Sequence, residues 1–416
     1  MEDIPQDVSM LLLTQNIGAI EAVGEALSDD TKQRTDAWVK SIASFLEKIA
    51  IKDGKPIDIV GIHFQEIGGK KFSEPFNAYF SKVIHLCQPS AGWCSGLLMP
   101  RKEDDLTFTA MGAVFFISKR LVPITSILSV RHRVYVAVVD DPIRTVGSPE
   151  YLFHGAKFSN AEKSRKGFLM TSLRVGTKIF NFVNTHLFHD ADNGVAVSTS
   201  PSPYVLRRRE ALAEALTEIS PVVSPADSLF IFGDFNLRLD GNKLVAFLEK
   251  KFSTKVDVGK KQVKAAAEVM DFFNNCERHL DQLRAFDLEG VEAMETAAQS
   301  TGVELAEFER NFRPTYPYAV PVTTERDNSG GDDPTSRDDS QTVRKYNTAR
   351  LPAWCDRVLF NPAALKLMIE PSKKAIAESL HKKREGIVAS GYQYSSVVLS
   401  EMDHEAVYLA VSFPQL

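Results

Sequence analysis

Residues 168–184 read Phe168-Leu169-Met170-Thr171-Ser172-Leu173-Arg174-Val175-Gly176-Thr177-Lys178-Ile179-Phe180-Asn181-Phe182-Val183-Asn184. Two strand-like runs, Phe168–Val175 and Lys178–Asn184, are separated only by Gly176-Thr177, a gap typical of a β-hairpin. Such a hairpin favours an α/β fold with sheets packed together over a simple parallel, doubly wound sheet.

Further strand-like and helical patterns surround this hairpin. We predict strands at residues 9–17, 57–64, 107–118, 133–139 and 229–232. Apolar residues recur at helical spacing between residues 38 and 49, and residues 205–219 and 260–283 also have helical patterns. Mixed strands and helices with short gaps again indicate α/β architecture.

The composition is that of an ordinary soluble globular protein, with 44% hydrophobic and 25% charged residues among 416. Its net charge of −5 excludes a highly basic, non-specific nucleic-acid binder, and we expect no nucleic-acid partner. The four cysteines include no CxxC pair. They therefore indicate neither a disulfide framework nor a zinc site, and they favour a reducing compartment.

Targeting signals are also missing from the printed sequence. Its start is acidic, and the apolar run at residues 10–13 is too short for a secretory signal. No stretch reaches the roughly 18 apolar residues of a membrane span, and the last residues lack the cysteine of a prenylation box. We expect an intracellular protein of the cytoplasm or nucleus that is not secreted and contacts membranes only peripherally.

Residues 323–343 are rich in Gly, Asp, Ser and Arg and have almost no apolar side chains. Such a segment buries too little surface to offset the entropy lost on ordering, so we predict a disordered loop. Segments with candidate motifs lie on both sides of it. Residues 1–416 are therefore predicted to form one domain that this loop decorates.

Polar side chains end several predicted strands, namely Asn16, Glu66, Asn184-Thr185-His186 and Asp234-Phe235-Asn236. Ligands bind at the ends of core strands in α/β folds, so this repetition predicts a shared site. Taken singly, each residue has another interpretation. Asn16 suits a turn, Glu66 a solvated carboxylate, and His186 a hydrogen-bonded structural histidine.

Asp234 and Asn236 stand at alternate positions after an apolar strand, so we expect both side chains to leave the same face. A carboxylate beside a carboxamide suits the activation and orientation of water near a hard metal ion. An ordinary turn is the alternative.

Two other segments pair acids with bases. Asp356-Arg357 opens an apolar run, and Asp403-His404 precedes another. A histidine that a carboxylate orients can stay protonated and polarise a phosphoryl oxygen. Cys355, beside the first pair, is interpreted as a small buried hydrophobe and not as a nucleophile.

These motifs resemble the inositol polyphosphate 5-phosphatases. The resemblance rests on Pro-Ala-Trp-Cys-Asp-Arg-Val-Leu at 352–359 and Gly-Asp-Phe-Asn-Leu-Arg at 233–238. Further matches are Gln65-Glu66, Asn184-Thr185-His186-Leu187, Pro314-Thr315-Tyr316 and Asp403-His404, so it spans roughly residues 10–412. The strings at 164–168, 188–190 and 316–318 look closest to the type I branch, which in animals favours soluble inositol phosphates.

The resemblance implies a four-layer α/β/β/α sandwich, shared with apurinic endonucleases and pancreatic-type nucleases, and a magnesium-dependent phosphomonoesterase. Glu66 would bind Mg²⁺, with Asn16 beside it and Asp403 completing the metal side. Magnesium prefers oxygen ligands and keeps several waters, so such a sparse set suffices.

The same resemblance implies the catalytic roles. Asp234 would activate the attacking water, and Asn236 would hold that water, the metal or the phosphate. His186 would contact the scissile phosphate. His404, oriented by Asp356, would stabilise charge on the phosphoryl oxygens without any covalent phosphoenzyme.

Substrate binding requires cations around the remaining phosphates, and Arg can clasp a phosphate with two hydrogen bonds. The predicted substrate-binding residues are Arg165, Lys166, Tyr316, Lys345, Arg350 and Arg357. Arg238 and Arg207-Arg208-Arg209 are further basic candidates, although one or two of that triple at most could face the site.

The chain departs from the family pattern at two positions. Glu405 follows Asp-His, where the family usually has Lys, and Pro317 stands where most branches outside type I have Lys. An acidic residue in a polyanion pocket would weaken phosphate binding unless its side chain points away.

The expected substrates are inositol polyphosphates, phosphoinositide lipids or both, and the sequence does not choose between them. Apolar contact with a bilayer is one option, with Phe72, Phe76, residues 97–99 and Phe188 as candidates, and ordinary core packing is the other. A nuclease of the same fold and a catalytically weak phosphoinositide-binding protein are the alternative functions. No regulatory protein partner is indicated.

Overall fold

The computed structural model describes residues 8–21, 27–51, 57–69, 72–88, 93–98, 109–138, 144–145, 154–161, 164–320, 344–369, 386–388 and 391–413. The loop predicted at 323–343 lies outside the described residues. No helix within them is both long and apolar enough to span a bilayer.

The first sheet combines strands from both ends of the chain. Its order is β15 (Tyr392–Val397), β16 (Ala406–Phe413), β1 (Val8–Asn16), β2 (Ile59–Gln65), β4 (Met111–Ser118), β3 (Trp93–Leu98) and β7 (Arg144–Thr145). β1 and β2 are parallel, with Asn16 opposite Gln65, so both strands end at the same edge.

The second sheet contains the hairpin at residues 168–184. Its order is β14 (Asp356–Phe360), β11 (Ser228–Asp234), β10 (Lys178–His186), β9 (Gly167–Val175), β5 (Thr125–Ser129) and β6 (Val134–Ala137), and β8 (His154–Lys157) also pairs with β9. β9 and β10 are antiparallel with Val175 opposite Lys178, as the short gap predicts. β10 and β11 run parallel and end together at His186 and Asp234.

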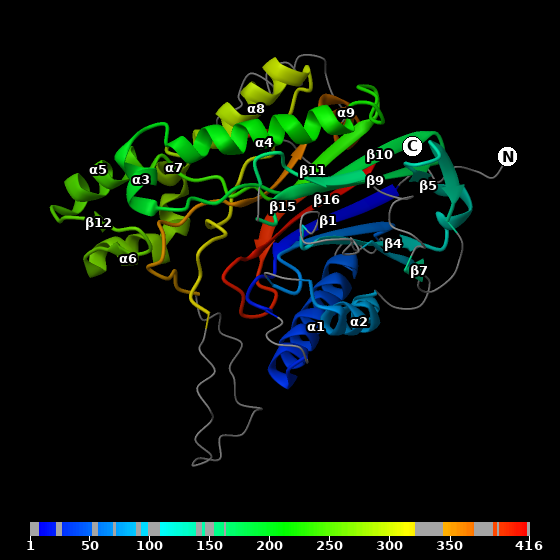
Figure 1. Ribbon diagram of the computed structural model, residues 1–416, viewed down its shortest axis with the longest axis horizontal. Coiled ribbons are helices and arrows are strands. Elements are labelled where there is room, and N and C mark those ends of the chain that lie inside the picture. Colours follow the sequence, from blue (N-terminus) through cyan, green and yellow to red (C-terminus); the bar gives the residue numbers. More distant parts are fainter. Residues whose placement is uncertain are drawn as a thin grey trace, which may run out of the picture.

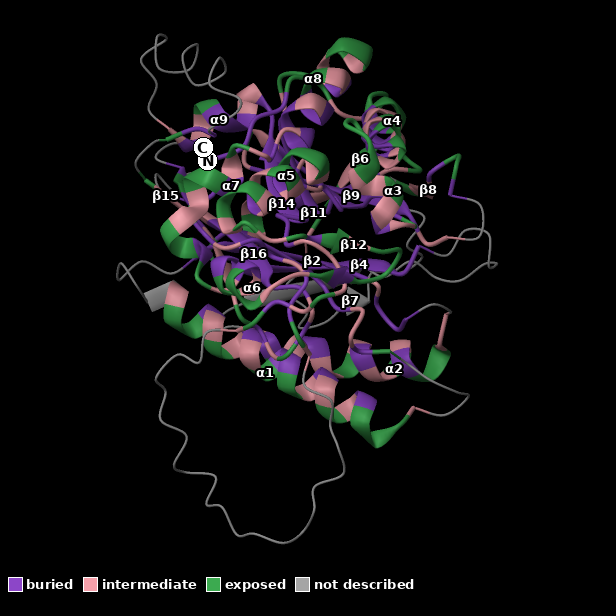
Figure 2. Ribbon diagram, turned by 90° about the vertical axis from the view of Figure 1, so that its left-hand side faces the viewer, coloured by how far each residue is buried: buried purple, intermediate pink, exposed green. Residues whose placement is uncertain are grey.

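Helices cover the outer faces of the two sheets (Figure 1). α1 (Asp29–Ile51) and α2 (Glu74–Val83), followed by the 3₁₀ turn Ile84–Cys87, lie on the first sheet. α4 (Pro203–Ile219) and α8 (Glu289–Thr301) pack on the second, and α9 (Pro362–Met368) contacts β11. Apolar residues of both sheets form the central core, and Figure 2 shows this buried interior between more exposed helices. The predicted four-layer α/β/β/α sandwich is confirmed.

A small lobe extends from the second sheet (Figure 1). It contains α3 (Asn193–Ser198), α5 (Gly241–Phe252), β12 (Asp257–Val258), β13 (Val263–Lys264), α6 (Ala267–Asn274), the 3₁₀ turn Cys276–His279 and α7 (Leu280–Arg284). The single helix predicted at 260–283 is therefore wrong. Its start is a hairpin strand, and Asn275 ends α6 by donating its side-chain amide to the Asp271 carbonyl at 2.9 Å.

A buried amide network fastens the two sheets near their shared edge. Gln65 Nε2 of β2 donates to Asn184 Oδ1 of β10 at 2.7 Å. Asn184 Nδ2 donates to the carbonyl of Gly112 on β4 at 2.9 Å. Buried amides require such partners, so the network admits one alignment of the sheets.

The parallel pair β10–β11 depends on a glycine immediately before Asp234. A Cβ at Gly233 would lie 2.1 Å from the Thr185 carbonyl oxygen, a backbone atom of β10 that cannot move aside easily. We predict that Gly233→Ala lowers the free energy of unfolding by about 2 kcal/mol or more because it overpacks this contact. Urea unfolding measures the change. Gly259→Ala is the control, since its nearest neighbour would be 3.5 Å away, and equal stability losses in the two variants would contradict the prediction.

Candidate active site

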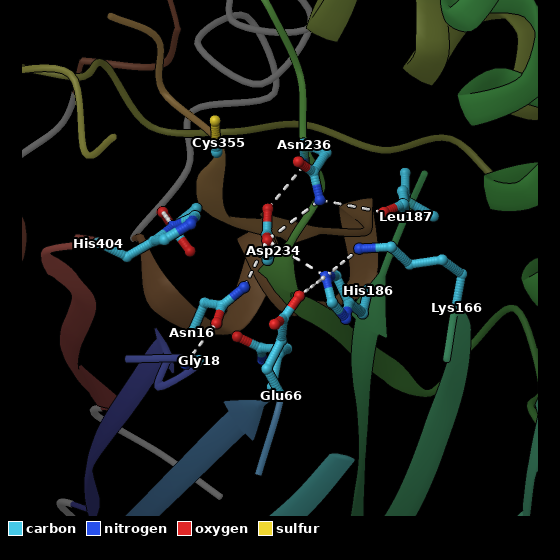
Figure 3. A network of polar contacts seen from close by, with 12 residues as sticks. Asn16, Gly18, Glu66, Lys166, His186, Leu187, Asp234, Asn236, Cys355 and His404 are labelled. Carbon is cyan, nitrogen blue, oxygen red and sulfur yellow. Dashed lines mark hydrogen bonds and ion pairs between the residues drawn. The ribbon is translucent and has the colours of Figure 1, made fainter. Parts of the chain in front are cut away.

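The ends of four strands bring polar groups of both sheets together (Figure 3). Asn16 ends β1, Glu66 follows β2, and His186 and Asp234 end β10 and β11. Asn16 Nδ2 donates to Asp234 Oδ2 at 2.9 Å across the sheets. His186 Nε2 lies 3.4 Å from Asp234 Oδ2 and 3.5 Å from Glu66 Oε1. The structure therefore brings together the strand-end residues that the sequence analysis groups.

Asp234 is a fixed, ionised carboxylate. Its Oδ1 accepts a hydrogen bond of 2.8 Å from the Asn236 backbone N–H, and its Oδ2 accepts one of 3.1 Å from Asn236 Nδ2. Burial alone would raise the pKa of Asp234, but the hydrogen bond with His186 and the positive groups His404 and Lys166 hold it well below its usual range. Asp234 is thus ready to accept a proton or ligate a cation.

Asn236 lies beyond the end of β11, so the alternation of side chains along a strand does not account for its position in the site. Its φ of 52° lies in the left-handed region that Asn adopts more readily than most residues. Arg238 Nη2 donates to its Oδ1 at 2.8 Å, which leaves Nδ2 to donate to Asp234 and to the Leu187 carbonyl at 3.0 Å. Arg238 therefore sets which end of the amide faces Asp234.

His404 and Asp356 form a buried ion pair on the other side of Asp234. The His404 Nδ1 to Asp356 Oδ2 distance is 2.8 Å, and Thr315 Oγ1 donates to the same carboxylate oxygen at 2.7 Å. Burial lowers the pKa of His404, but Asp356 outweighs burial and raises that pKa to about 9. The Gln15 side chain holds the His404 carbonyl at 3.0 Å. His404 is therefore an oriented imidazolium near neutral pH.

His186 is neutral, in contrast to His404. Burial and the neighbouring Lys166 ammonium lower the pKa of His186, and Lys166 contacts His186 Nε2 directly. Burial also lowers the pKa of Lys166, to about 8. The neutral His186 ring can therefore form hydrogen bonds beside the Lys166 ammonium without adding a second positive imidazole to that of His404.

The candidate metal side is rich in oxygen donors. Glu66, Asn16 and Asp403 line one cleft with Asp234. Burial and the carboxylates of Glu66 and Asp234 raise the pKa of Asp403. Such repulsion between neighbouring carboxylates is expected where a cation binds among them. Arg165 Nη2 offsets part of this charge by pairing with Glu66 at 3.0 Å. The donor set fits a hard divalent ion such as Mg²⁺.

Asp234, Asp356 and His404 also lie close enough to suggest a second metal-binding site, with candidate ligand atoms within 4.8 Å of one another. However, His404 Nδ1 is engaged by Asp356. A protonated histidine is not a metal ligand, so we interpret this trio as an ion pair beside Asp234.

The cleft has a volume of about 800 Å³, and basic groups line it together with the carboxylates. Of the predicted substrate-binding residues, Arg165, Lys166, Tyr316 and Arg350 line it. Arg350 Nη1 donates to Asn193 Oδ1 at 2.7 Å, which fixes the guanidinium at the rim. The positive side of the cleft therefore suits an anion.

Two of the predicted substrate-binding residues do not reach the cleft. Arg357 is buried among acids and pairs with Asp287 at 2.5 Å and Glu307 at 3.1 Å, so its assignment to substrate is wrong. Lys345 is exposed and is not among the lining residues. In the triple Arg207-Arg208-Arg209, Arg208 is buried against Asp190 and Glu289. A sequence position beside a motif does not reveal which acid an arginine already pairs with.

Two basic side chains in the cleft have no assigned role in the sequence analysis. Arg34 of α1 and His189 both line the cleft. Burial and the positive charges of Lys166, Arg350 and Arg238 lower the pKa of His189 to about 4. His189 is part of the Phe188-His189-Asp190 string, a usable signal, whereas Arg34 lies in an ordinary amphipathic helix pattern.

Cys355 is fully buried, as interpreted from the sequence. Burial raises the pKa of its thiol, and Arg238 Nη1 contacts its Sγ at 3.1 Å. A buried, protonated thiol is a poor nucleophile. Cys355 therefore packs behind the site.

Comparison with known proteins matches this chain over nearly its whole length. The model of endonuclease/exonuclease/phosphatase family 2 matches residues 29–410. Inositol polyphosphate-5-phosphatase A of Canis lupus familiaris is 28% identical over 97% of this chain and 92% of that protein. The probable type I inositol 1,4,5-trisphosphate 5-phosphatase of Caenorhabditis elegans is 26% identical over 87% of this chain and 93% of that protein.

A solved structure has a similar fold. The inositol polyphosphate 5-phosphatase domain of SPsynaptojanin, crystallised with inositol 1,4-bisphosphate and calcium, matches with a TM-score of 0.52 and 15% identity. The match covers 98% of this chain and 84% of that one.

The His404–Asp356 pair makes stability depend on pH. The folded pKa of His404 lies above the unfolded value, so its contribution is fully present below about pH 6.5 and is lost as pH rises through about 9. We predict that Asp356→Asn costs about 3 kcal/mol of unfolding free energy near neutral pH, because it leaves a buried charge unpaired. The gap from the parent protein should narrow toward about pH 10.

Urea unfolding at several pH values, without added metal, measures this gap. Asp281→Asn is the control, since that carboxylate is 91% exposed and its loss should change little. A gap for Asp356→Asn that stays constant across the pH range would contradict the assignment.

Proposed function

This chain belongs to endonuclease/exonuclease/phosphatase family 2 and to its inositol polyphosphate 5-phosphatase branch, closest to type I. From this premise we propose that it hydrolyses the 5-phosphate of phosphorylated inositols in a Mg²⁺-dependent reaction. The observation that carries the proposal is the position of Asp234 between an oxygen-rich cation site and the His404 imidazolium. The proposed substrates are inositol 1,4,5-trisphosphate, inositol 1,3,4,5-tetrakisphosphate, phosphatidylinositol 4,5-bisphosphate and phosphatidylinositol 3,4,5-trisphosphate.

Asp234 is the proposed general base. It is ionised, and Asn16 and Asn236 hold its carboxylate in one orientation, so it can take a proton from a water placed beside it. Asn236 orients that water. Because the Cys355 thiol is buried and protonated, direct attack by water suits the site better than a covalent intermediate.

His404 and His186 are proposed to hold the scissile phosphate. His404 presents a positive, carboxylate-oriented ring, so it stabilises charge that develops on the phosphoryl oxygens. His186 does so through its neighbour: its ring is 1% exposed and does not line the cleft, whereas Lys166, which the ring contacts, does line it. Glu66, Asn16 and Asp403 would hold Mg²⁺, which supplies further charge stabilisation when bound.

The phosphates that remain on the ring require fixed cations. Arg350 at the rim, with Tyr316 beside it, and Arg165 near Glu66 supply them on two sides of the cleft. His189 and Arg238 add donors near Arg350. These groups suit several phosphates on one small ring better than a single phosphodiester, which, together with the net charge of −5, argues against a nuclease.

Asp234→Asn tests the base. We predict that the variant loses a factor of about 1,000 or more in kcat while its KM changes little, because the amide keeps the shape and loses the proton acceptor. Phosphate release from inositol 1,4,5-trisphosphate, with magnesium and then with chelator, measures this. Asp227→Asn, just before the opposite end of β11, is the matched control and should keep parent activity. Normal turnover in Asp234→Asn would remove it as the base.

The same assay tests the reaction class and substrates. Release from the soluble trisphosphate is compared with release from vesicles that contain phosphatidylinositol 3,4,5-trisphosphate. Magnesium-dependent release from at least one substrate is expected. Failure with both substrates would leave a catalytically weak binding protein as the better conclusion.

Glu405 stands where the family usually has Lys, and it is not among the residues that line the cleft. It is 6% exposed, its Oε2 accepts a hydrogen bond of 3.0 Å from Ser396 Oγ, and Arg344 and Arg313 interact with its charge. We predict that Glu405→Lys leaves the KM for polyphosphorylated substrates unchanged and lowers stability by about 3 kcal/mol, because a buried lysine would face two arginines.

Steady-state kinetics and urea unfolding check these two effects. Exposed Glu304, at the opposite end of the second sheet, supplies the control variant Glu304→Lys, which should alter neither quantity. A several-fold fall in KM for Glu405→Lys would show that position 405 reaches bound phosphate.

A further inference from the structure

A lysine-rich hairpin projects from the small lobe. β12 and β13 pair Asp257 with Lys264 and Val258 with Val263. Lys255, Lys260, Lys261 and Lys264 are all exposed, and Asp257 is the single acidic residue between positions 255 and 264. This segment, the lysine hairpin (residues 255–264), is strongly positive although the whole chain carries −5.

The lysine hairpin is attached to the rim of the cleft. The Val263 N–H donates to the Thr348 carbonyl at 2.7 Å, and the Asn193 N–H donates to the Lys260 carbonyl at 3.1 Å. Asn193 Oδ1 in turn accepts the hydrogen bond from Arg350, which lines the cleft. A surface that contacts the hairpin is therefore held beside the mouth of the cleft. Figure 2 views the molecule from the end at which β12 lies, with α3, α5 and α6 around it.

Exposed apolar side chains accompany the lysines. Val195 of α3 is 42% exposed and lies two residues after Asn193, and Leu206 of α4 is 54% exposed. Of the apolar residues considered from the sequence, Phe76 and Phe188 are buried in the core, and Phe72 packs partly buried against it. Residues 97 and 98 lie in β3 with undescribed side chains, and residue 99 lies outside the described residues.

We propose that the lysine hairpin docks this protein on membranes containing anionic lipids, with the mouth of the cleft beside the lipid headgroups. Clustered lysines are attracted to the negative potential of anionic lipid surfaces. Exposed Val195 lies on α3, which contacts β12, and exposed Leu206 lies on α4, which contacts α3. Both favour an interface with an apolar layer over a purely acidic protein partner. Docking itself is independent of catalysis, whereas its benefit to lipid substrates rests on the proposed function.

The test variant is Lys260→Glu/Lys261→Glu in the full chain. The matched control is Lys119→Glu/Lys366→Glu, which changes net charge equally at the end of the molecule opposite the cleft, since both residues are exposed there. Binding is measured by co-sedimentation with phosphatidylcholine vesicles, with and without phosphatidylserine. We expect the parent and the control to bind the anionic vesicles and the test variant to bind at least about tenfold more weakly.

Two further measurements keep the outcomes distinct. Thermal unfolding and turnover of soluble inositol 1,4,5-trisphosphate should be unchanged in the test variant, and Lys255→Glu/Lys264→Glu should weaken binding similarly if the first variant is unstable. The proposal would be overturned if the parent protein did not bind anionic vesicles, or if the test variant and the control Lys119→Glu/Lys366→Glu lost binding equally. Vesicle binding by the parent protein without any turnover of the proposed substrates would count against the proposed function and leave the docking proposal standing.

Discussion

The hydrogen bond between Gln65 and Asn184 joins the two sheets at the edge where the site lies. Each sheet alone carries only half of the polar constellation, with Asn16 and Glu66 on one and His186 and Asp234 on the other. A shift of one sheet against the other would leave these buried amides unsatisfied, which is costly. The alignment of the sheets, and with it the approach of Asn16 to Asp234, therefore depends on this contact together with the buried contact of His63 Nδ1 with the Phe232 carbonyl at 3.0 Å.

Charge is distributed around Asp234 so that opposite signs alternate. His404 and Asp356 form one pair, and Lys166 lies near Glu66 on the other side. Each buried charge has a counter-charge within reach, and the raised pKa of Asp403 marks a place where negative charge is incompletely offset. This imbalance is what a divalent cation would correct, and the arginines that line the same cleft suit the anion that such a cation would help to bind.

The fold and the central site could largely be predicted from local patterns. The hairpin of β9 and β10 follows from a two-residue gap, and Asp234 follows directly from its place at the end of an apolar strand. The failures have a common cause. Whether Arg357 meets substrate or Asp287, and whether residues 260–283 continue as one helix, depends on partners far away in the sequence, which local pattern does not contain. The single-domain boundary remains a prediction.

Glu66 and Asn236, one candidate metal ligand and one candidate water-orienting residue, both follow strand ends with positive φ, 62° and 52°. Each such backbone conformation costs roughly 1 kcal/mol for a residue with a side chain. Glycine would relieve that strain at either position and would remove the functional group. Glycine at either position is therefore expected to stabilise the fold at the expense of the proposed metal ligand or the proposed water-orienting amide.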